Sequence, residues 1–307
     1  MLAAHLLAAS GLTPVDPDSP NTERIEDLFW FITFWAALVL LSVAVPLAIF
    51  VLRYRSRGRS RAVEGPQVHG STRLEIAWTV VPVVILLIVT VFTFYKLPGI
   101  TLDAEAGEDV TRIRVEGRQF YWQYRYPNGV IAIDTLRAPA DRLVELEITA
   151  PENDVIHSYW VPDLFAKFDA IPGRTIETAF RGEPGTYRGQ CAEFCGIQHA
   201  EMFATIEVID ADEFDAWLSE EARRQETGDS DLGEQIFAGA CAKCHGDQGQ
   251  GLIGPGLSAS TVSNAAAVEE IVRNGRGKMP VVGEAWSDQQ MKALTDHLRE
   301  RFSGDSG

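Results

Sequence analysis

The chain has 307 residues, which is enough for about two domains that each bury their own core. Hydrophobic residues make up 46% of it, and 27 basic against 43 acidic residues give a net charge of −16. This acidic balance argues against nucleic acid as a partner and suits a cationic soluble protein, although a solvated acidic surface has the same composition.

Two long apolar windows come first along the chain. Residues 28–52 and 76–95 carry almost no charge, and each has about 20 residues or more, enough to span a hydrocarbon core of roughly 30 Å as a helix. Buried core helices are the alternative, but these seldom run past about 20 residues without a polar face. Pro46 and Pro82 do not count against membrane helices, which tolerate kinks. The sequence therefore predicts a two-helix transmembrane hairpin.

The segment between the two windows is rich in arginine. Against the acids Glu64 and Glu75 it carries Arg53, Arg55, Arg57, Arg59, Arg61 and Arg73. Short cationic loops stay in the cytoplasm, so we expect both chain ends, and everything after Lys96, to lie on the outer side of a bacterial inner membrane. Residues 1–12 resemble a short apolar signal segment that lacks the usual basic region.

The exterior part begins with β-type patterns. Short alternating apolar runs separated by turn residues extend from Thr111 to Val208, the clearest at 143–149, 175–180 and 203–209. This spacing, with no long amphipathic helix in between, predicts a β-sandwich or barrel. A short helix at 213–225 follows, and the polar, glycine-bearing stretch 226–231 is interpreted as a linker.

The last part of the chain has helical periodicity. Apolar residues recur at helical spacing in 232–244, 264–275 and 287–302, and Ser287 or Asp288 can cap the last helix. The pattern predicts a small all-α domain of about 75 residues, a size that usually needs a covalent or metal staple. A short linker would let this domain reach the sandwich without a tight interface.

Two thiols, an imidazole and a thioether lie within residues 191–202. The ligands of a blue-copper site, two imidazoles, a thiolate and a weak thioether, are available from His157, Cys195, His199 and Met202. Cys191 adds a second thiolate, which could bridge a second copper ion. A tetrahedral zinc site and a disulfide of an exported domain are the alternatives, but zinc would leave Met202 without a role.

The other two cysteines lie in a C-x-x-C-H sequence formed by Cys241, Cys244 and His245. In an exported domain this pattern is typical of covalent attachment of a c-type haem, with the histidine as an iron ligand. A redox dithiol would need a βαβ context and a zinc site would need two more ligands nearby. The candidates for the sixth iron ligand are Met279, Met291 and His297. We favour Met279 because it lies in a glycine-rich, proline-marked loop, whereas the other two lie in the last amphipathic helix.

These motifs are similar to those of a known family. The stretches HSYWVPDLFAKFDAIPGR (157–174) and GTYRGQCAEFCGIQHAEM (185–202) resemble the copper domain of subunit II of the haem–copper cytochrome c oxidases. GRQFYWQY (117–124) and LEIAWTVVP (74–82) resemble the aromatic stretch and second span of the same family. The resemblance covers roughly residues 25 to 220, and it implies a cupredoxin-like Greek-key β-sandwich that holds a binuclear copper centre, CuA.

The resemblance also implies roles for single residues. The copper ligands would be the bridging Cys191 and Cys195, the terminal His157 and His199, the weakly axial Met202, and the backbone carbonyl of Glu193. The Glu193 side chain would reach a magnesium ion shared with subunit I. The aromatic electron path would be Phe120, Tyr121 and Trp122. Most relatives have tryptophan where this chain has Phe120, which puts the family's usual docking route for soluble cytochrome c in doubt.

Two further features extend the resemblance. IGPGL (253–257) looks like the proline loop of class I cytochromes c, beside the proximal histidine. Glu75 matches a family position at the mouth of a proton channel, although a carboxylate in the first turn of a helix is also stabilised by the helix dipole. The division that we expect is an N-terminal segment (1–24), a transmembrane hairpin (25–98), a CuA domain (99–225) and a cytochrome c domain (226–307).

The whole pattern is similar to subunit II of caa3-type oxidases, in which the donor cytochrome is fused to the copper domain. Electrons from a soluble or membrane-bound cytochrome c, or a similar donor, would then pass through the haem and CuA to subunit I, coupled to proton translocation. Subunit III and membrane lipid would be further partners, and the oxygen-reducing site would lie outside this chain. One alternative is a CuA-bearing subunit of a nitric oxide reductase. The other is a copper-delivery protein, but copper delivery would have no use for a haem.

Overall fold

The structure of the chain is a computed structural model that describes residues 17–55, 67, 69–98, 100, 109–228, 231–284 and 286–302. The chain divides into two compact units, residues 23–100 and a larger unit formed by 1–22 and 101–307. The signal-like residues 1–12 lie outside the described residues, as do Glu64 and three of the loop arginines, Arg57, Arg59 and Arg61.

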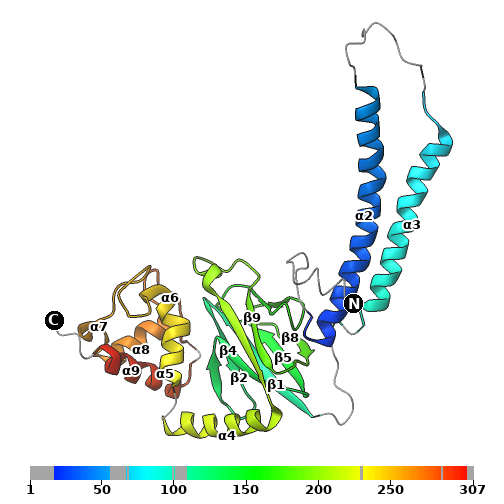
Figure 1. Cartoon of the computed structure of the whole chain (residues 1–307). Coiled ribbons are helices and arrows are strands. Elements are labelled where there is room, and N and C mark those ends of the chain that lie inside the picture. Colours follow the sequence, from blue (N-terminus) through cyan, green and yellow to red (C-terminus); the bar gives the residue numbers. More distant parts are fainter. Residues whose placement is uncertain are drawn as a thin grey trace. The chain divides into compact units, whose positions relative to one another are not determined.

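The smaller unit is a pair of long apolar helices, α2 (Pro20–Tyr54) and α3 (Thr72–Lys96) (Figure 1). Each contains an 18-residue window with a mean hydropathy of 2.6 and no buried residue, so both are long and apolar enough to cross a membrane. The core helix of a soluble protein would bury such a surface, whereas here leucines such as Leu40 and Leu87 are exposed. Between the helices, the rings of Phe31 and Phe92 stack 3.9 Å apart.

The larger unit contains a sandwich of two five-stranded sheets (Figure 1). The first sheet has the order β3 (Ile131–Ile133), β2 (Tyr121–Arg125), β1 (Val110–Arg118), β5 (Leu143–Thr149) and β8 (Ile176–Phe180). The second has the order β4 (Thr135–Pro139), β10 (Phe203–Ile209), β9 (Gly185–Cys191), β6 (His157–Trp160) and β7 (Phe168–Ala170). β1 pairs in parallel with β5 and β4 with β10, while the other pairs are antiparallel. The predicted β-sandwich is confirmed.

The sandwich core follows from strand alternation. Along β1, Ile113 and Val115 are fully buried while Arg112 and Arg114 are exposed, because successive side chains point to opposite faces. Burial of one such aliphatic side chain stabilises the fold by about 1.5–3 kcal/mol. In the second sheet β6 pairs antiparallel with β9, with Tyr159 opposite Cys191. This pairing brings the start of β6 close to the end of β9.

Helix α4 (Ala211–Thr227) follows the last strand and stays attached to the sandwich. Phe214 is buried in the sandwich core, and the Gln225 side chain bonds both backbone groups of Ile131, at 3.1 and 2.7 Å. The helix ends at Gly228, which has the left-handed φ of 78° that favours glycine. The helix therefore includes residues 226 and 227 of the predicted linker. The prediction ended the helix too early, because the polar residues that suggested a linker continue its exposed face.

The last part of the chain is helical, as predicted. It consists of α5 (Leu232–Ile236), a single π-turn η2 (Phe237–Cys241), α6 (Ala242–His245), α7 (Ala259–Val262), α8 (Ala265–Asn274) and α9 (Asp288–Phe302). Of the two predicted caps for α9, Ser287 is the one used: its hydroxyl accepts from the Gln290 backbone N–H while its own N–H donates to the Gln290 side chain.

The expectation that this helical part needs no tight interface with the sandwich is wrong. Its hydrophobic cluster includes Tyr121, Ile131 and Ile133 of the sandwich together with Leu232, Ile236 and Phe237. All four residues 121–124 of β2 are buried, so both faces of this strand are covered. The side of β2 and β3 that faces away from the sandwich core carries Tyr121, Ile131 and Ile133 together with the polar Gln123, and the helical domain covers these residues.

Candidate metal and haem sites

The two thiols of the first cysteine pair lie side by side at the end of β9 in the second sheet. The Sγ atoms of Cys191 and Cys195 are 3.9 Å apart, nearly twice a disulfide bond length of about 2.05 Å, so the described thiols are free. Cys191 ends β9, and Cys195 follows it on the loop to β10. Both side chains are buried, with 3% exposure. The disulfide alternative is therefore absent from the structure.

Four further donor atoms surround the sulfur pair. His157 Nδ1 lies 3.9 Å from Cys191 Sγ, and the three ligand atoms of His157, Cys191 and Cys195 lie within 4.8 Å of one another. His199 Nδ1 and Met202 Sδ lie 3.6 and 3.8 Å from Cys195 Sγ. The carbonyl oxygen of Glu193 is 3.2 Å from Cys191 Sγ. The structure thus brings together all six residues that the sequence pointed to.

A carboxylate fixes the orientation of the first histidine. The Nε2 atom of His157 lies 3.1 Å from Asp154 Oδ1, which leaves Nδ1 directed at the thiols. Burial alone would lower the pKa of His157, but the hydrogen bonds with Asp154 and Cys191 raise it. Ligating histidines usually carry such a partner on the second ring nitrogen, because it sets the tautomer and the ring orientation. Sequence reasoning missed Asp154, for which the only signal is a carboxylate three residues before the histidine.

The two thiols differ in how readily they lose a proton. The contact with Cys195, and after it the contact with His157, lowers the pKa of Cys191, while the contact with Cys191 and burial raise the pKa of Cys195. One negative charge is therefore favoured on the pair and a second is costly, unless a cation takes the place of the shared proton. Soft thiolates, two imidazoles and a thioether are the donors that copper prefers, so these residues fit a copper centre.

The aromatic stretch (117–124) lies against residues 191–202, which we call the copper loop. The backbone carbonyl of Cys195 accepts a hydrogen bond from Gln119 Nε2 at 2.6 Å, and the Trp122 ring lies 6.0 Å from the His157 ring. Phe120 is 7% exposed and packs so closely on Gly196 that an added Cβ there would lie 2.9 Å from the Phe120 ring. The Glu193 side chain, in contrast, is exposed to solvent.

The residues of the C-x-x-C-H motif lie around one pocket of the helical domain. Its lining includes Cys241, Cys244, His245, Val272, Met279 and Val282 of this domain, together with Gln119 and Phe120 of the sandwich. The Nδ1 atom of His245 lies 2.7 Å from the carbonyl oxygen of Pro255. A carbonyl can only accept, so this nitrogen carries the proton and Nε2 keeps a free lone pair for a metal. This geometry fits an axial haem ligand.

The alternatives for this motif fit less well. A redox dithiol needs a thiol of low pKa, whereas burial raises the pKa of Cys241 to about 12 and also raises that of Cys244. Of the three candidates for the sixth ligand, Met279 alone lines the pocket. Met291 is buried in the hydrophobic core, and the His297 ring packs on Phe237.

Glu75 lies in the first turn of α3, where its carboxylate faces the helix N-terminus. That position accounts for a stabilising contact with the helix dipole, worth about 0.3–1 kcal/mol. A proton path through Glu75 stays a prediction.

Three family models match the chain in sequence order. Residues 9–95 match "Cytochrome C oxidase subunit II, transmembrane domain", residues 134–209 match its "periplasmic domain", and residues 228–298 match "Cytochrome C oxidase, cbb3-type, subunit III". A "Cytochrome c oxidase subunit 2" of Alkalihalophilus pseudofirmus is 35% identical over 254 residues, which cover 80% of this chain and 73% of that protein. This chain belongs to the cytochrome c oxidase subunit 2 family.

A second relative and a solved structure are also similar to this chain. A "Probable cytochrome c oxidase subunit 2" of Rickettsia bellii is 34% identical over 235 residues, covering 70% of this chain and 85% of that protein. The periplasmic domain of subunit II of cytochrome oxidase from Bradyrhizobium japonicum is 29% identical and covers 40% of this chain and 99% of that one, with a TM-score of 0.37.

Membership of the subunit 2 family establishes the domains of this chain and the complex to which it belongs. The chain is a membrane protein with a periplasmic copper domain and a C-terminal cytochrome c domain, and it is a subunit of a cytochrome c oxidase. The periplasmic domain implies CuA copper, and the cytochrome domain implies haem c. Both implied cofactors fit the residues present, because buried soft ligands surround the thiol pair and a correctly oriented histidine follows the C-x-x-C motif.

Proposed function

We propose that this chain is subunit II of a caa3-type cytochrome c oxidase in a bacterial inner membrane, and that it carries electrons from a cytochrome c or similar donor to subunit I. When bound, haem c and CuA supply one-electron carriers that change little in geometry. The observation that carries the proposal is the presence of two complete ligand sets in one compact unit of a subunit 2 family member.

The ligand assignment follows from position. In this proposal Cys191 and Cys195 would bridge the copper ions, His157 and His199 would bind one ion each, and Met202 and the Glu193 carbonyl would complete the ligand set. Cys241 and Cys244 attach the haem, with His245 and Met279 on the iron. Phe120, Tyr121 and Trp122 form the aromatic path that lies against the copper loop.

The chain's own residues do three things in this function. They bury four of the six proposed copper ligands from water, hold the two ring nitrogens of His157 in fixed roles through Asp154, and keep Nδ1 of His245 bonded to Pro255 so that Nε2 is left for the haem iron. The exposed Glu193 carboxylate is free to bind a magnesium ion at the contact with subunit I. Exclusion of water keeps the reorganisation on electron transfer small.

The remaining assignments rest on charge and composition. Both termini lie outside, because the loop between the membrane helices is cationic. The net charge of −16 favours a basic donor. Subunits I and III and membrane lipid surround the hairpin, and Glu75 serves proton uptake on the cytoplasmic side. The division into 1–24, 25–98, 99–225 and 226–307 is retained. The nitric oxide reductase alternative is not favoured, because the relatives are named oxidase subunits.

Metal analysis of the purified chain tests the proposal. We expect two copper ions and one covalent haem per chain, with a mixed-valence copper signal shared over both ions. Cys195→Ser should abolish that shared signal, because a hydroxyl is a poor bridge for copper, and should leave the haem spectrum intact. One copper or one zinc ion per haem would contradict the assignment.

A further inference from the structure

The sandwich and the cytochrome domain share a buried apolar seam. Tyr121, Ile131 and Ile133, on the outward side of β2 and β3, have at most 5% exposure and belong to the hydrophobic cluster of the cytochrome domain. Outward-facing residues of this kind would be exposed if the domain moved freely on its tether. The contact therefore has the character of a domain core, not of a transient encounter.

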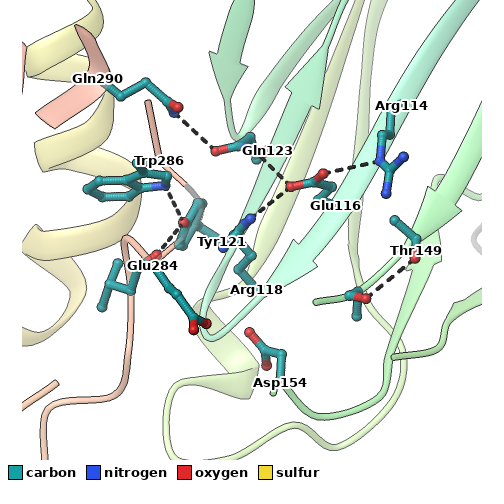
Figure 2. Close-up of polar contacts among 12 residues, drawn as sticks. Arg114, Glu116, Arg118, Tyr121, Gln123, Thr149, Asp154, Glu284, Trp286 and Gln290 are labelled. Carbon is teal, nitrogen blue, oxygen red and sulfur yellow. Dashed lines mark hydrogen bonds and ion pairs between the residues drawn. The ribbon is translucent and has the colours of Figure 1, made fainter. Parts of the chain in front are cut away.

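Polar side chains bond across this seam in specific pairs (Figure 2). Trp286 Nε1 donates to the Tyr121 hydroxyl at 3.0 Å, and that hydroxyl donates to the Val282 carbonyl, also at 3.0 Å. Gln290 Nε2 donates to Gln123 Oε1 at 3.2 Å, and both glutamine side chains are fully buried. A buried polar group left without its partner costs free energy, so these pairs favour one register of the two domains.

A lysine inside the haem-attachment motif also crosses the seam. Lys243, the residue before Cys244, donates from Nζ to the Phe120 carbonyl at 2.8 Å and to Asp134 Oδ2 at 2.7 Å. Its side chain is 15% exposed and that of Asp134 is 25% exposed. Its backbone carbonyl accepts a hydrogen bond from Gln198, the residue before His199. The haem motif thus contacts both the aromatic stretch and the copper loop.

Asp134 is itself held in place for this contact. Its Oδ1 accepts from the Trp122 N–H at 2.8 Å, and its backbone bonds to Trp122 and Thr205. Burial raises the pKa of Asp134, although the Lys243 ammonium opposes this shift. Both charges are only partly exposed to solvent, so loss of either member leaves the other half-buried and unpaired, which is unfavourable.

We infer that the cytochrome domain is docked on β2 and β3 of the copper domain in a single register, and that Lys243 is the positioning residue that holds the haem motif against the copper loop. The docked domain covers Tyr121 and bonds to the Phe120 carbonyl, so the partner of this copper-domain surface is the chain's own cytochrome domain and not an external donor. The identity of the two cofactors rests on the proposed function, whereas the docking rests on the contacts alone.

Hydrogen exchange of the full-length chain in detergent tests the docking without reference to activity. Lys243→Leu removes the ammonium but keeps the backbone carbonyl and all haem-motif residues. We expect amides of 119–123 and 279–284 to exchange about tenfold faster, the change in opening equilibrium that corresponds to a loss of 1.4 kcal/mol. The matched control is Lys292→Leu, which breaks an exposed pair with Asp296 on α9 and should leave the seam unchanged. Lys243→Arg should restore protection.

A steric wedge provides a second, independent variant. Gly239 lies in η2, and a Cβ added there would lie 2.3 Å from Ile133 Cγ2 and 3.1 Å from Asp134 Oδ2, with its three nearest neighbours all in the sandwich. Alanine favours helical backbone over glycine, so Gly239→Ala does not harm the cytochrome domain locally. It should nevertheless speed exchange at the seam, whereas Ala238→Ser, at the exposed neighbouring position, should not.

The copper and haem signals of the same samples separate the two proposals. With both centres loaded, the haem should enhance the spin relaxation of the copper to a degree that depends on the copper–haem distance. We expect one fixed distance in the parent and in Lys292→Leu, and a spread of distances in Lys243→Leu. Unchanged seam exchange in both Lys243→Leu and Gly239→Ala would overturn the docking inference. Samples that lack copper or haem while the seam stays protected would overturn the proposed function and leave the docking in place.

Discussion

The carboxylate behind the copper site offers a quantitative test of how the centre is supported. Asp154 is 9% exposed at its side chain, and its Oδ1 lies 3.1 Å from His157 Nε2. Loss of such a partner typically lowers metal affinity about 10- to 100-fold, which corresponds to roughly 1.4–2.8 kcal/mol. Asp154 also accepts the backbone N–H groups of Gln119 and Val155, so Asp154→Ala frees the loop as well as the ring. We expect an effect near the upper end of this range.

Copper competition against a chelator, with the full-length chain, measures this affinity. Asp154→Asn should have a smaller effect than Asp154→Ala, because its amide oxygen can still accept from His157, but it lacks the negative charge. Asp169→Ala is the matched control, since it removes an exposed carboxylate from the neighbouring strand β7. The copper hyperfine pattern should change in the Asp154 variants alone. Parental copper affinity in Asp154→Ala, or an equal loss in the control, would refute the role assigned to Asp154.

Four further outcomes are expected. Met279→Leu should lower the haem reduction potential in a redox titration and leave copper content unchanged, because a thioether ligand raises that potential. Glu75→Ala should slow oxygen consumption without loss of copper or haem, and an unchanged rate would leave only the helix-dipole role. Tyr121→Phe leaves the Val282 carbonyl and Trp286 N–H unpaired, so urea unfolding should show a loss of about 1–3 kcal/mol. The hydrogen bond from Arg142 lowers the pKa of Asp215. The stabilisation of the fold by this pair is therefore present above the ordinary carboxyl pKa and is lost as the pH falls through the lowered pKa of Asp215. The difference in melting temperature between the parent and Arg142→Gln should accordingly shrink from pH 7 toward pH 3.

Much of the site was predictable because its chemistry is local in sequence. The thiols and their nearest partners lie within residues 191–202, and a single longer step reaches His157 on the neighbouring strand. The C-x-x-C-H motif is equally compact, and the loop around Met279 carries its own glycine and proline signals. Ligand type and short spacing decide such sites, so the sequence was enough to name the residues that the structure brings together.

The contacts between the domains could not be found in this way. Lys243 and Asp134 are 109 residues apart, and Gln123 and Gln290 are 167 apart. Lys243 and Gln123 lie within motifs but at positions that the motifs do not specify, Asp134 and Gln290 lie outside them, and all four residue types are common on a solvated surface. Periodicity describes which face of one element is apolar, but it does not say which faces meet. The linker length alone favoured a loosely tethered domain, and the structure contradicts that expectation.

One signal for the docking was present in the sequence, in the strand that became β2. A strand with one face in water alternates between buried and exposed residues, as β1 does, whereas a strand covered on both faces has a continuous buried run. Residues 121–124 read Tyr-Trp-Gln-Tyr and are all buried: Trp122 and Tyr124 in the sandwich core, Tyr121 and Gln123 beneath the cytochrome domain. On the outward face Tyr121 lies with Ile131 and Ile133 of β3 in one cluster, and these residues would form an exposed apolar patch unless another element covered them. The cytochrome domain therefore has a structural role in the copper domain as well as its proposed role as the site where electrons enter.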